Sequence, residues 1–109
     1  MLEFPFQAKM TDGFAALLRR TAGECHRDEP DMLPSIAWCR FQSGPRAGTS
    51  NWTVHFFSRR FMNPEDVFSI GEISVHVAAN ERQRLKGRVL DWIKAQGLVA
   101  HQDSPNVDG

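Results

Sequence analysis

Two cysteines and a histidine fall within residues 25–39, and another histidine stands at position 55. Thiols and imidazoles are groups that bind zinc or act as nucleophile and base. The spacing of Cys25, His26, Cys39 and His55 matches no zinc framework with two closely spaced ligands at each end. Alternation along two expected strands puts Cys39 and His55 on opposite faces. We therefore predict two buried, structural cysteines, no metal site and no cofactor.

A second candidate for chemistry is a cross-strand row of Trp38, His55 and Glu72. A carboxylate opposite an imidazole orients the ring and raises its basicity, as a general base requires. The alternative is an exposed pair that contributes up to about 1 kcal/mol to sheet stability. We favour this alternative because a flat sheet offers no pocket and no oxyanion donors. The expectation is a protein that is not an enzyme and has no catalytic residue.

The elements that position these residues follow from hydrophobic periodicity. "TDGFAALLRRTAGECH" predicts an amphipathic helix capped by Thr11. "SIAWCRFQ" and "NWTVHFFS" predict two strands joined by the loop "SGPRAGTS", and residues 67–79 predict a third strand with a bulge at Gly71. A last helix is expected from Asn80 to Gly97, followed by a short edge strand in "LVAHQ". The expected fold is α+β, with two layers in the order α-β-β-β-α and both helices on one face of a three-stranded antiparallel sheet.

The order helix, three strands, helix resembles the topology of the double-stranded RNA-binding domain, with "SGPRAG" in the place of that family's first hairpin loop. The resemblance implies contacts to phosphates from the start of the second helix. That start is lysine-rich in the family ("KKxAK"), whereas it is "NERQRLK" here, with Glu81 at an early position. No membership is inferred.

A symmetric closure of the first hairpin places Cys39 opposite Val54 and Trp38 opposite His55. One face of the sheet is then apolar and is expected to lie under both helices; it includes Trp52, Val54 and Phe56. The other face has no helix to cover it, and apolar side chains left in the open mark a contact surface. The predicted partner-binding residues on that face are Trp38, Arg40, His55, Phe57, Ile70 and Glu72.

Charge is distributed unevenly although its formal sum is zero. Between Met32 and Pro64 there are four arginines and no acid, and the expected last helix is also basic. Arginine interleaved with aromatic residues is typical of nucleic-acid surfaces, although a solvated helix face with two basic loops explains the same pattern. The candidate anion-binding residues are Arg46, Arg59, Arg60, Arg82 and Arg84.

These patterns together predict one globular domain over residues 1–102 and a disordered polar tail over residues 103–109. The chain shows no signal peptide and no apolar run long enough to cross a bilayer, so a cytoplasmic protein without a membrane partner is expected. The expected function is a small protein-interaction module, of the inhibitor, immunity or adaptor type, that binds another protein or a second copy of itself. The alternative is a nucleic-acid-binding domain.

Overall fold

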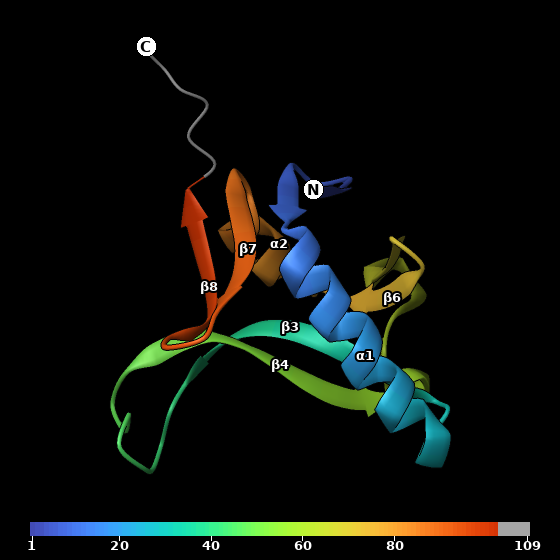
Figure 1. The fold of residues 1–109 in the computed structure, drawn as a ribbon, viewed down its shortest axis with the longest axis horizontal. Coiled ribbons are helices and arrows are strands. Elements are labelled where there is room, and N and C mark those ends of the chain that lie inside the picture. The colour runs from blue at the N-terminus through green and yellow to red at the C-terminus, as the bar shows by residue number, and fades with distance from the viewer. Residues whose placement is uncertain (103–109) are drawn as a thin grey trace.

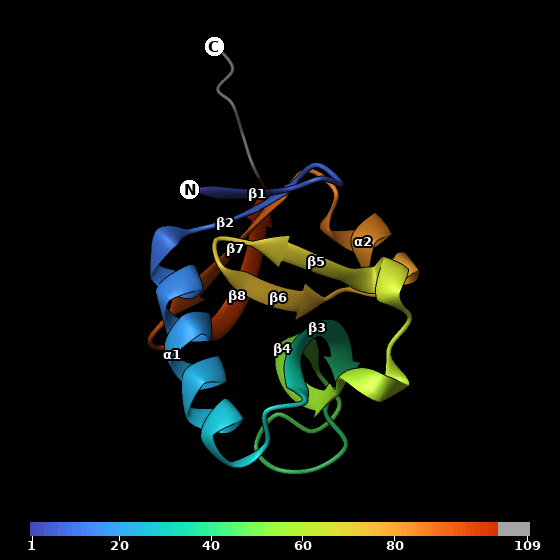
Figure 2. The same ribbon diagram turned by 90° about the vertical axis from the view of Figure 1, so that its right-hand side faces the viewer.

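The computed structural model describes residues 1–102, and the tail predicted over residues 103–109 lies outside them. The chain forms two four-stranded mixed sheets and two α-helices, so the expectation of a single three-stranded antiparallel sheet is wrong. The first sheet has the order β1-β2-β7-β8 and the second the order β4-β3-β6-β5 (Figure 1 and Figure 2).

The bounds of the elements are as follows. The first sheet contains β1 (Leu2–Phe4), β2 (Ala8–Met10), β7 (Arg88–Ile93) and β8 (Gly97–Gln102). The second contains β3 (Met32–Arg40), β4 (Ser50–Ser58), β5 (Val67–Ile70) and β6 (Ile73–His76). The helices are α1 (Asp12–Asp28) and α2 (Ala79–Leu85), and the 3₁₀ turns η1 (Arg59–Phe61) and η2 (Pro64–Asp66) join β4 to β5.

The helix α1 confirms the amphipathic helix predicted after Thr11. The Thr11 side chain accepts a hydrogen bond from the backbone N–H of Phe14 at 3.2 Å, which satisfies a donor of the first turn. The same Thr11 hydroxyl donates to Asp91 on β7 at 2.8 Å, so the cap also attaches the start of the helix to the first sheet. Phe14 and Leu18 are buried on the side of the helix that faces the core.

The two helices lie on opposite flanks of the molecule rather than on one face of a sheet (Figure 2). α1 runs along one side and α2 along the other, with β5 and β6 between them. The core lies between the two sheets and α1. Its largest fully buried side chains include Met10, Phe14, Ile36, Val75, Val77, Leu85 and Leu90. Within residues 1–102 neither helix is long and apolar enough to cross a membrane.

The predicted third strand is a hairpin. Gly71 and Glu72 have φ of 56° and 67°, and they form the two-residue connection between β5 and β6. Positive φ at both central residues is the geometry of a type I′ turn, which suits the twist of a β-hairpin. Ile70 pairs with Ile73 across the turn, and both are buried. The change of apolar phase at Gly71 therefore reflects a reversal of the chain and not a bulge.

The predicted last helix ends early. α2 ends at Leu85, Gly87 adopts a φ of 78°, and the residues from Arg88 onward form β7. Consecutive residues Val89 and Leu90 are both buried, and because their side chains point to opposite faces, both faces of β7 are covered there. The final edge strand is confirmed as β8.

The pairing of β3 with β4 differs from the symmetric closure by three residues. Trp38 lies opposite Trp52, and Ile36 lies opposite Val54. An odd shift moves every side chain of one strand to the other face. The alternation predicted for β4 holds, with Trp52 buried and His55 and Phe57 exposed, whereas the face predicted for Trp38 and Arg40 is wrong.

A pair of glycine substitutions tests the β5–β6 turn. Gly71→Ala should lower the free energy of unfolding by about 1 to 2 kcal/mol, because a side chain is strained at positive φ and its Cβ would also collide with the Leu2 side chain. Gly23→Ala, in α1 with open space around it, should instead raise it by roughly 0.5 to 1 kcal/mol. Urea denaturation of both variants checks the prediction, and equal effects of the same sign would contradict the turn.

Candidate binding groove

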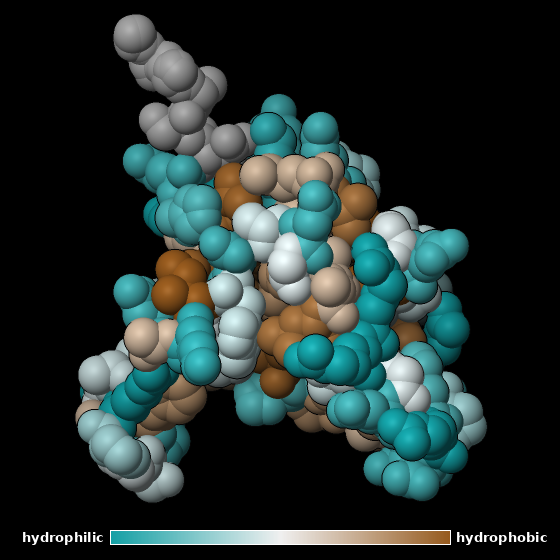
Figure 3. All heavy atoms as spheres, in the orientation of Figure 1, coloured by the Kyte–Doolittle hydropathy of each residue, from teal (hydrophilic) through white to brown (hydrophobic). Residues whose placement is uncertain are grey.

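An apolar groove of about 400 Å³ opens between α1, β4 and the turn that joins β7 to β8. Figure 3 shows hydrophobic residues gathered in a hollow beside α1 and above β4. Aromatic and aliphatic side chains dominate the lining, and the volume falls in the range of natural ligand sites. The lining residues are Phe14, Leu17, Leu18, Thr21, Phe41, Arg46, Asn51, Trp52, Thr53, Val54, Phe56, Trp92, Gln96, Gly97 and Leu98.

The strand β4 supplies the floor of this groove through alternation. Trp52, Val54 and Phe56 share one face of the strand and line the groove, while His55 and Phe57 point to the other side. The sequence predicts this set as apolar but expects helices to cover it. α1 covers it only in part, because its buried residues pack between the sheets.

The helix and the second hairpin supply the walls. Leu17 lies one position before the buried Leu18, so it sits at the border between the core and the groove. Trp92, near the end of β7, is 47% exposed and lines the groove from the other side. An exposed indole beside an apolar hollow is a typical anchor for a bound molecule.

The charge of the groove comes from Arg46 in the β3–β4 loop. Among residues 1–102, it is the one ionised side chain in the lining, and its guanidinium has no ion pair there. The remaining polar groups are neutral: Thr21, Asn51, Thr53 and Gln96. A bound molecule would therefore meet an apolar surface with one positive charge at its border.

The structure does not bring the six predicted partner-binding residues together. Trp38 and Arg40 share the face of Trp52, whereas His55 and Phe57 lie on the opposite face. Ile70 is only 8% exposed and belongs to the core, and Glu72 lies in the β5–β6 turn. Ser35, not Trp38, lies opposite His55, so the expected row with Glu72 does not form.

The five candidate anion-binding arginines are dispersed as well. Arg46 lies in the loop before β4, and Arg59 and Arg60 follow its end. A strand rises about 3.3 Å per residue, so the two ends of β4 are roughly 26 Å apart. Arg60 lies 3.9 Å from Asp31. Arg82 and Arg84, which lie on α2, also form ion pairs with carboxylates.

Those two arginines, Arg82 and Arg84, are held by carboxylates. Arg84 lies 3.6 Å from Glu81. Glu81 is itself buried, and its Oε2 accepts a hydrogen bond from the backbone N–H of Trp38 at 3.1 Å. The strand β6 ends at His76 and so offers no backbone acceptor to the Trp38 amide on β3. The Glu81 carboxylate supplies that acceptor instead.

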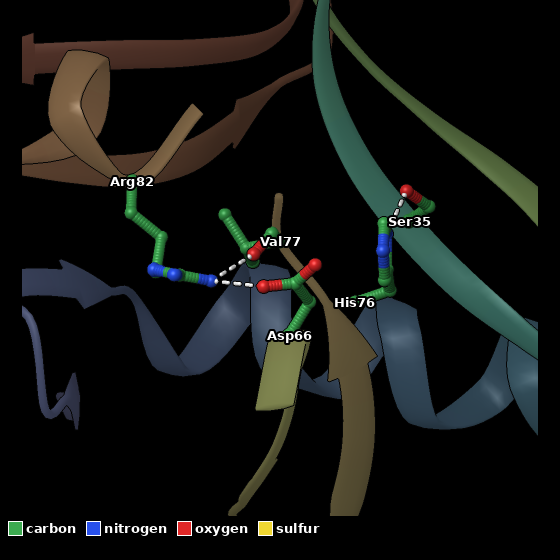
Figure 4. Close-up of polar contacts among 5 residues, drawn as sticks. All are labelled: Ser35, Asp66, His76, Val77 and Arg82. Carbon is green, nitrogen blue, oxygen red and sulfur yellow. Dashed lines mark hydrogen bonds and ion pairs between the residues drawn. The ribbon is translucent and has the colours of Figure 1, made fainter. Parts of the chain in front are cut away.

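A serine and a histidine also meet, at the junction of β3 and β6 (Figure 4). Ser35 Oγ lies 2.8 Å from His76 Nδ1, a contact typical of a nucleophile and its base. The nearby carboxylate of Asp66 is directed to Arg82 and not to the imidazole, and Ser35 is only 6% exposed. Ser35 and His76 are also the register pair that joins β3 to β6, so the hydrogen bond serves to connect the two strands.

Arg82 organises the other half of this cluster. Its guanidinium donates to Asp66 at 2.7 Å and to the carbonyl of Val77 at 2.8 Å, and it lies over the Phe68 ring. The hydrogen bond from Arg82 lowers the pKa of Asp66 below its usual value, with further help from the charges of Arg82 and His76. The pair joins η2 to α2.

The two cysteines are free and half-buried, not buried as predicted. Cys39 accepts a hydrogen bond from the hydroxyl of Thr53 at 3.3 Å. Across residues 1–102, no three His, Cys, Asp or Glu side chains gather in a way that could hold a metal ion.

The Arg82–Asp66 pair predicts a specific loss of stability in acid. A carboxyl whose pKa is lowered by folding contributes stability above its unfolded pKa of about 4, and this contribution is lost as the pH falls through the folded value. Asp66→Asn should therefore be less stable than the wild type at neutral pH, and the difference should shrink below about pH 4. Denaturation midpoints across this range check the prediction. Glu65→Gln removes the neighbouring carboxylate without touching Arg82 and should keep the wild-type slope.

The sequence matches no protein-family model, and no curated protein is similar to it at a significant level.

Proposed function

We propose that this protein is a non-catalytic interaction module that binds another protein through the groove between α1, β4 and the β7–β8 turn. Its role would be that of an adaptor or inhibitor, in the reducing, cytoplasmic setting that suits two free cysteines. The observation that carries the proposal is the composition of the groove. The centres of protein interfaces are depleted in charge and rich in aromatic residues, and the groove combines Phe41, Trp52, Phe56 and Trp92 with a single arginine.

The other candidate sites support this choice, because their polar groups already bond to other residues of the same chain. The Ser35–His76 contact joins two strands, and the Arg82–Asp66 pair joins two further elements. Glu81 is committed to Trp38 and Arg84. The groove, by contrast, leaves the Trp92 indole half exposed, which costs free energy unless a partner covers it.

Nucleic acid is the second candidate, and one cleft favours it. Trp38, Arg84 and Arg88 line a hollow of about 540 Å³, and the Arg84 guanidinium lies 5.9 Å from the centre of the Trp38 ring. An exposed indole beside arginines suits a stacked base and its phosphate. Two features weaken this candidate: Arg84 faces Glu81, and the Arg88 side chain already donates to the carbonyl of Ala100.

A matched pair of exposed aromatic residues tests the proposal. Trp92→Ala should weaken binding of the natural protein partner by about 2 kcal/mol, roughly thirtyfold, because it removes an anchor of the groove. Phe61→Ala removes an aromatic ring that is 81% exposed but does not line the groove, so binding should not change. Retention of proteins from host extract by the three immobilised forms, quantified by mass spectrometry with and without nuclease, provides the measurement.

Three outcomes of this experiment are decisive. Proteins retained by the wild type and Phe61→Ala but not by Trp92→Ala support the groove. Equal retention by all three forms contradicts it. Retention that nuclease abolishes, and that Trp92→Ala does not affect, favours the Trp38 cleft and nucleic acid instead.

A further inference from the structure

The strand β4 is the outer strand of its sheet and pairs with β3 on one side only. It is nine residues long, and "SNWTVHFFS" contains no proline, lysine or acid. Natural proteins protect such edges with short strands, charges, prolines or covering segments, because an open edge is a template for another strand. β4 has none of the protecting residues.

The hydrogen bonds at the two ends of the β3–β4 hairpin show which backbone groups of β4 remain open. The N–H of Phe41 donates to the carbonyl of Thr49 at 2.8 Å, and the N–H of Arg59 donates to the carbonyl of Asp31 at 2.8 Å. Bonded pairs alternate with non-bonded pairs in an antiparallel ladder, so odd-numbered residues of β4 are bonded to β3. The N–H and C=O groups of the even-numbered residues point away from β3.

Those even-numbered residues are the ones whose side chains form the floor of the groove. β8 lies near β4, but within residues 1–102 no backbone hydrogen bond joins the two strands. Trp52, Val54 and Phe56 thus leave their outer backbone groups without a strand partner and present apolar side chains to the groove. A segment in extended conformation can bond to these backbone groups and fill the apolar groove at the same time. Its backbone continues the hydrogen-bond ladder of the sheet, and its alternate side chains enter the groove beside α1. This is the recognition mode known as strand addition.

We propose that the occupant of the groove is an extended segment of another protein, which pairs with β4 as an added strand and carries an acidic side chain near Arg46. The proposal rests on the proposed function and specifies its partner. Charge complementarity supplies the acid, because Arg46 is the unpaired cation of the lining in residues 1–102. It also disfavours a second copy of this edge, since residues 32–64 contain no acid that could meet Arg46.

The other sheet edges are less suited to this role. β5 and β1 have only four and three residues, and the rings of Phe4 and Phe6 on the N-terminal segment pack against Phe68 on β5. β8 has six residues, but its Ala100 carbonyl already accepts from Arg88. β4 is both the longest outer strand and the one beside an apolar groove.

The test uses a display library of random dodecapeptides selected on the full-length protein. We expect enriched sequences with alternating apolar residues and at least one acid, and their affinity should fall at least tenfold with Trp92→Ala. Synthetic versions of one enriched peptide, each N-methylated at a single position, then probe the ladder. Methylation at alternate positions should weaken binding at least tenfold, and at the positions between them less than threefold, because only every second peptide N–H faces β4.

Amide exchange of the protein provides an independent readout. In the free protein, the amides of Trp52, Val54 and Phe56 should exchange faster than those of Thr53 and His55, which bond to β3. Saturating peptide should slow the first group at least tenfold and leave the second group unchanged. Arg46→Ser should weaken binding of an acidic peptide severalfold and should not affect a variant peptide whose acid is replaced by its amide.

The outcomes separate the two proposals. Enriched peptides that need Trp92 but show no alternation on N-methylation overturn strand addition and leave the groove as a protein-binding site. A library that yields no peptide dependent on Trp92 overturns both. If the free protein is a dimer and the even-numbered β4 amides are already protected from exchange in it, the edge is occupied by a second copy. That result overturns the proposed occupant.

Discussion

The register between β3 and β4 is the constraint on which the rest of this structure depends. Pairing Trp38 with Trp52 and Ile36 with Val54 brings apolar side chains of both strands to the same side. The buried Trp52 side chain then separates the groove beside α1 from the cleft lined by Trp38. A shift by one residue would turn the apolar side chains of β4 away from α1 and remove the groove.

The position of α1 explains why the apolar face of β4 stays partly open. Its Thr11 cap is attached to β7 through Asp91, and Phe14 and Leu18 are used between the sheets. The helix therefore lies against β3 and β7 and does not also cover the whole of β4. The apolar surface that the sequence assigns to a helix-covered core becomes a groove, since one helix cannot bury its face against two sheets completely.

The polar clusters of the protein hold elements together across the sheets. Ser35 and His76 link β3 to β6 where the parallel pairing is short, and Arg82 and Asp66 link η2 to α2. Glu81 extends the bonding of β3 beyond the end of β6. Because most of these groups are paired with one another, the features that remain for recognition at the groove are its apolar surface, Arg46 at its border and the backbone of an outer strand.

The elements whose signals are short in range follow from the sequence alone. The Thr11 cap and the apolar periodicity predict α1, alternation predicts which residues of β4 are apolar, and "LVAHQ" predicts the edge strand β8. The groove was not predicted, because it exists only where α1, β4 and the β7–β8 turn meet. Of its lining, the sequence marks Arg46 alone as a candidate binding residue.

Three features were decided by tertiary contacts. Leu85, Val89, Trp92 and Ile93 fit a helical stripe, yet the chain from Arg88 onward is a strand because it pairs with β2, which lies some eighty positions earlier in the sequence. The apolar phase at Gly71 fits both a bulge and a turn, and the pairing of β6 with β3 selects the turn. The register of β3 depends on which face can be buried against the first sheet, and alternation within one strand carries no information about a neighbour that is distant in the chain.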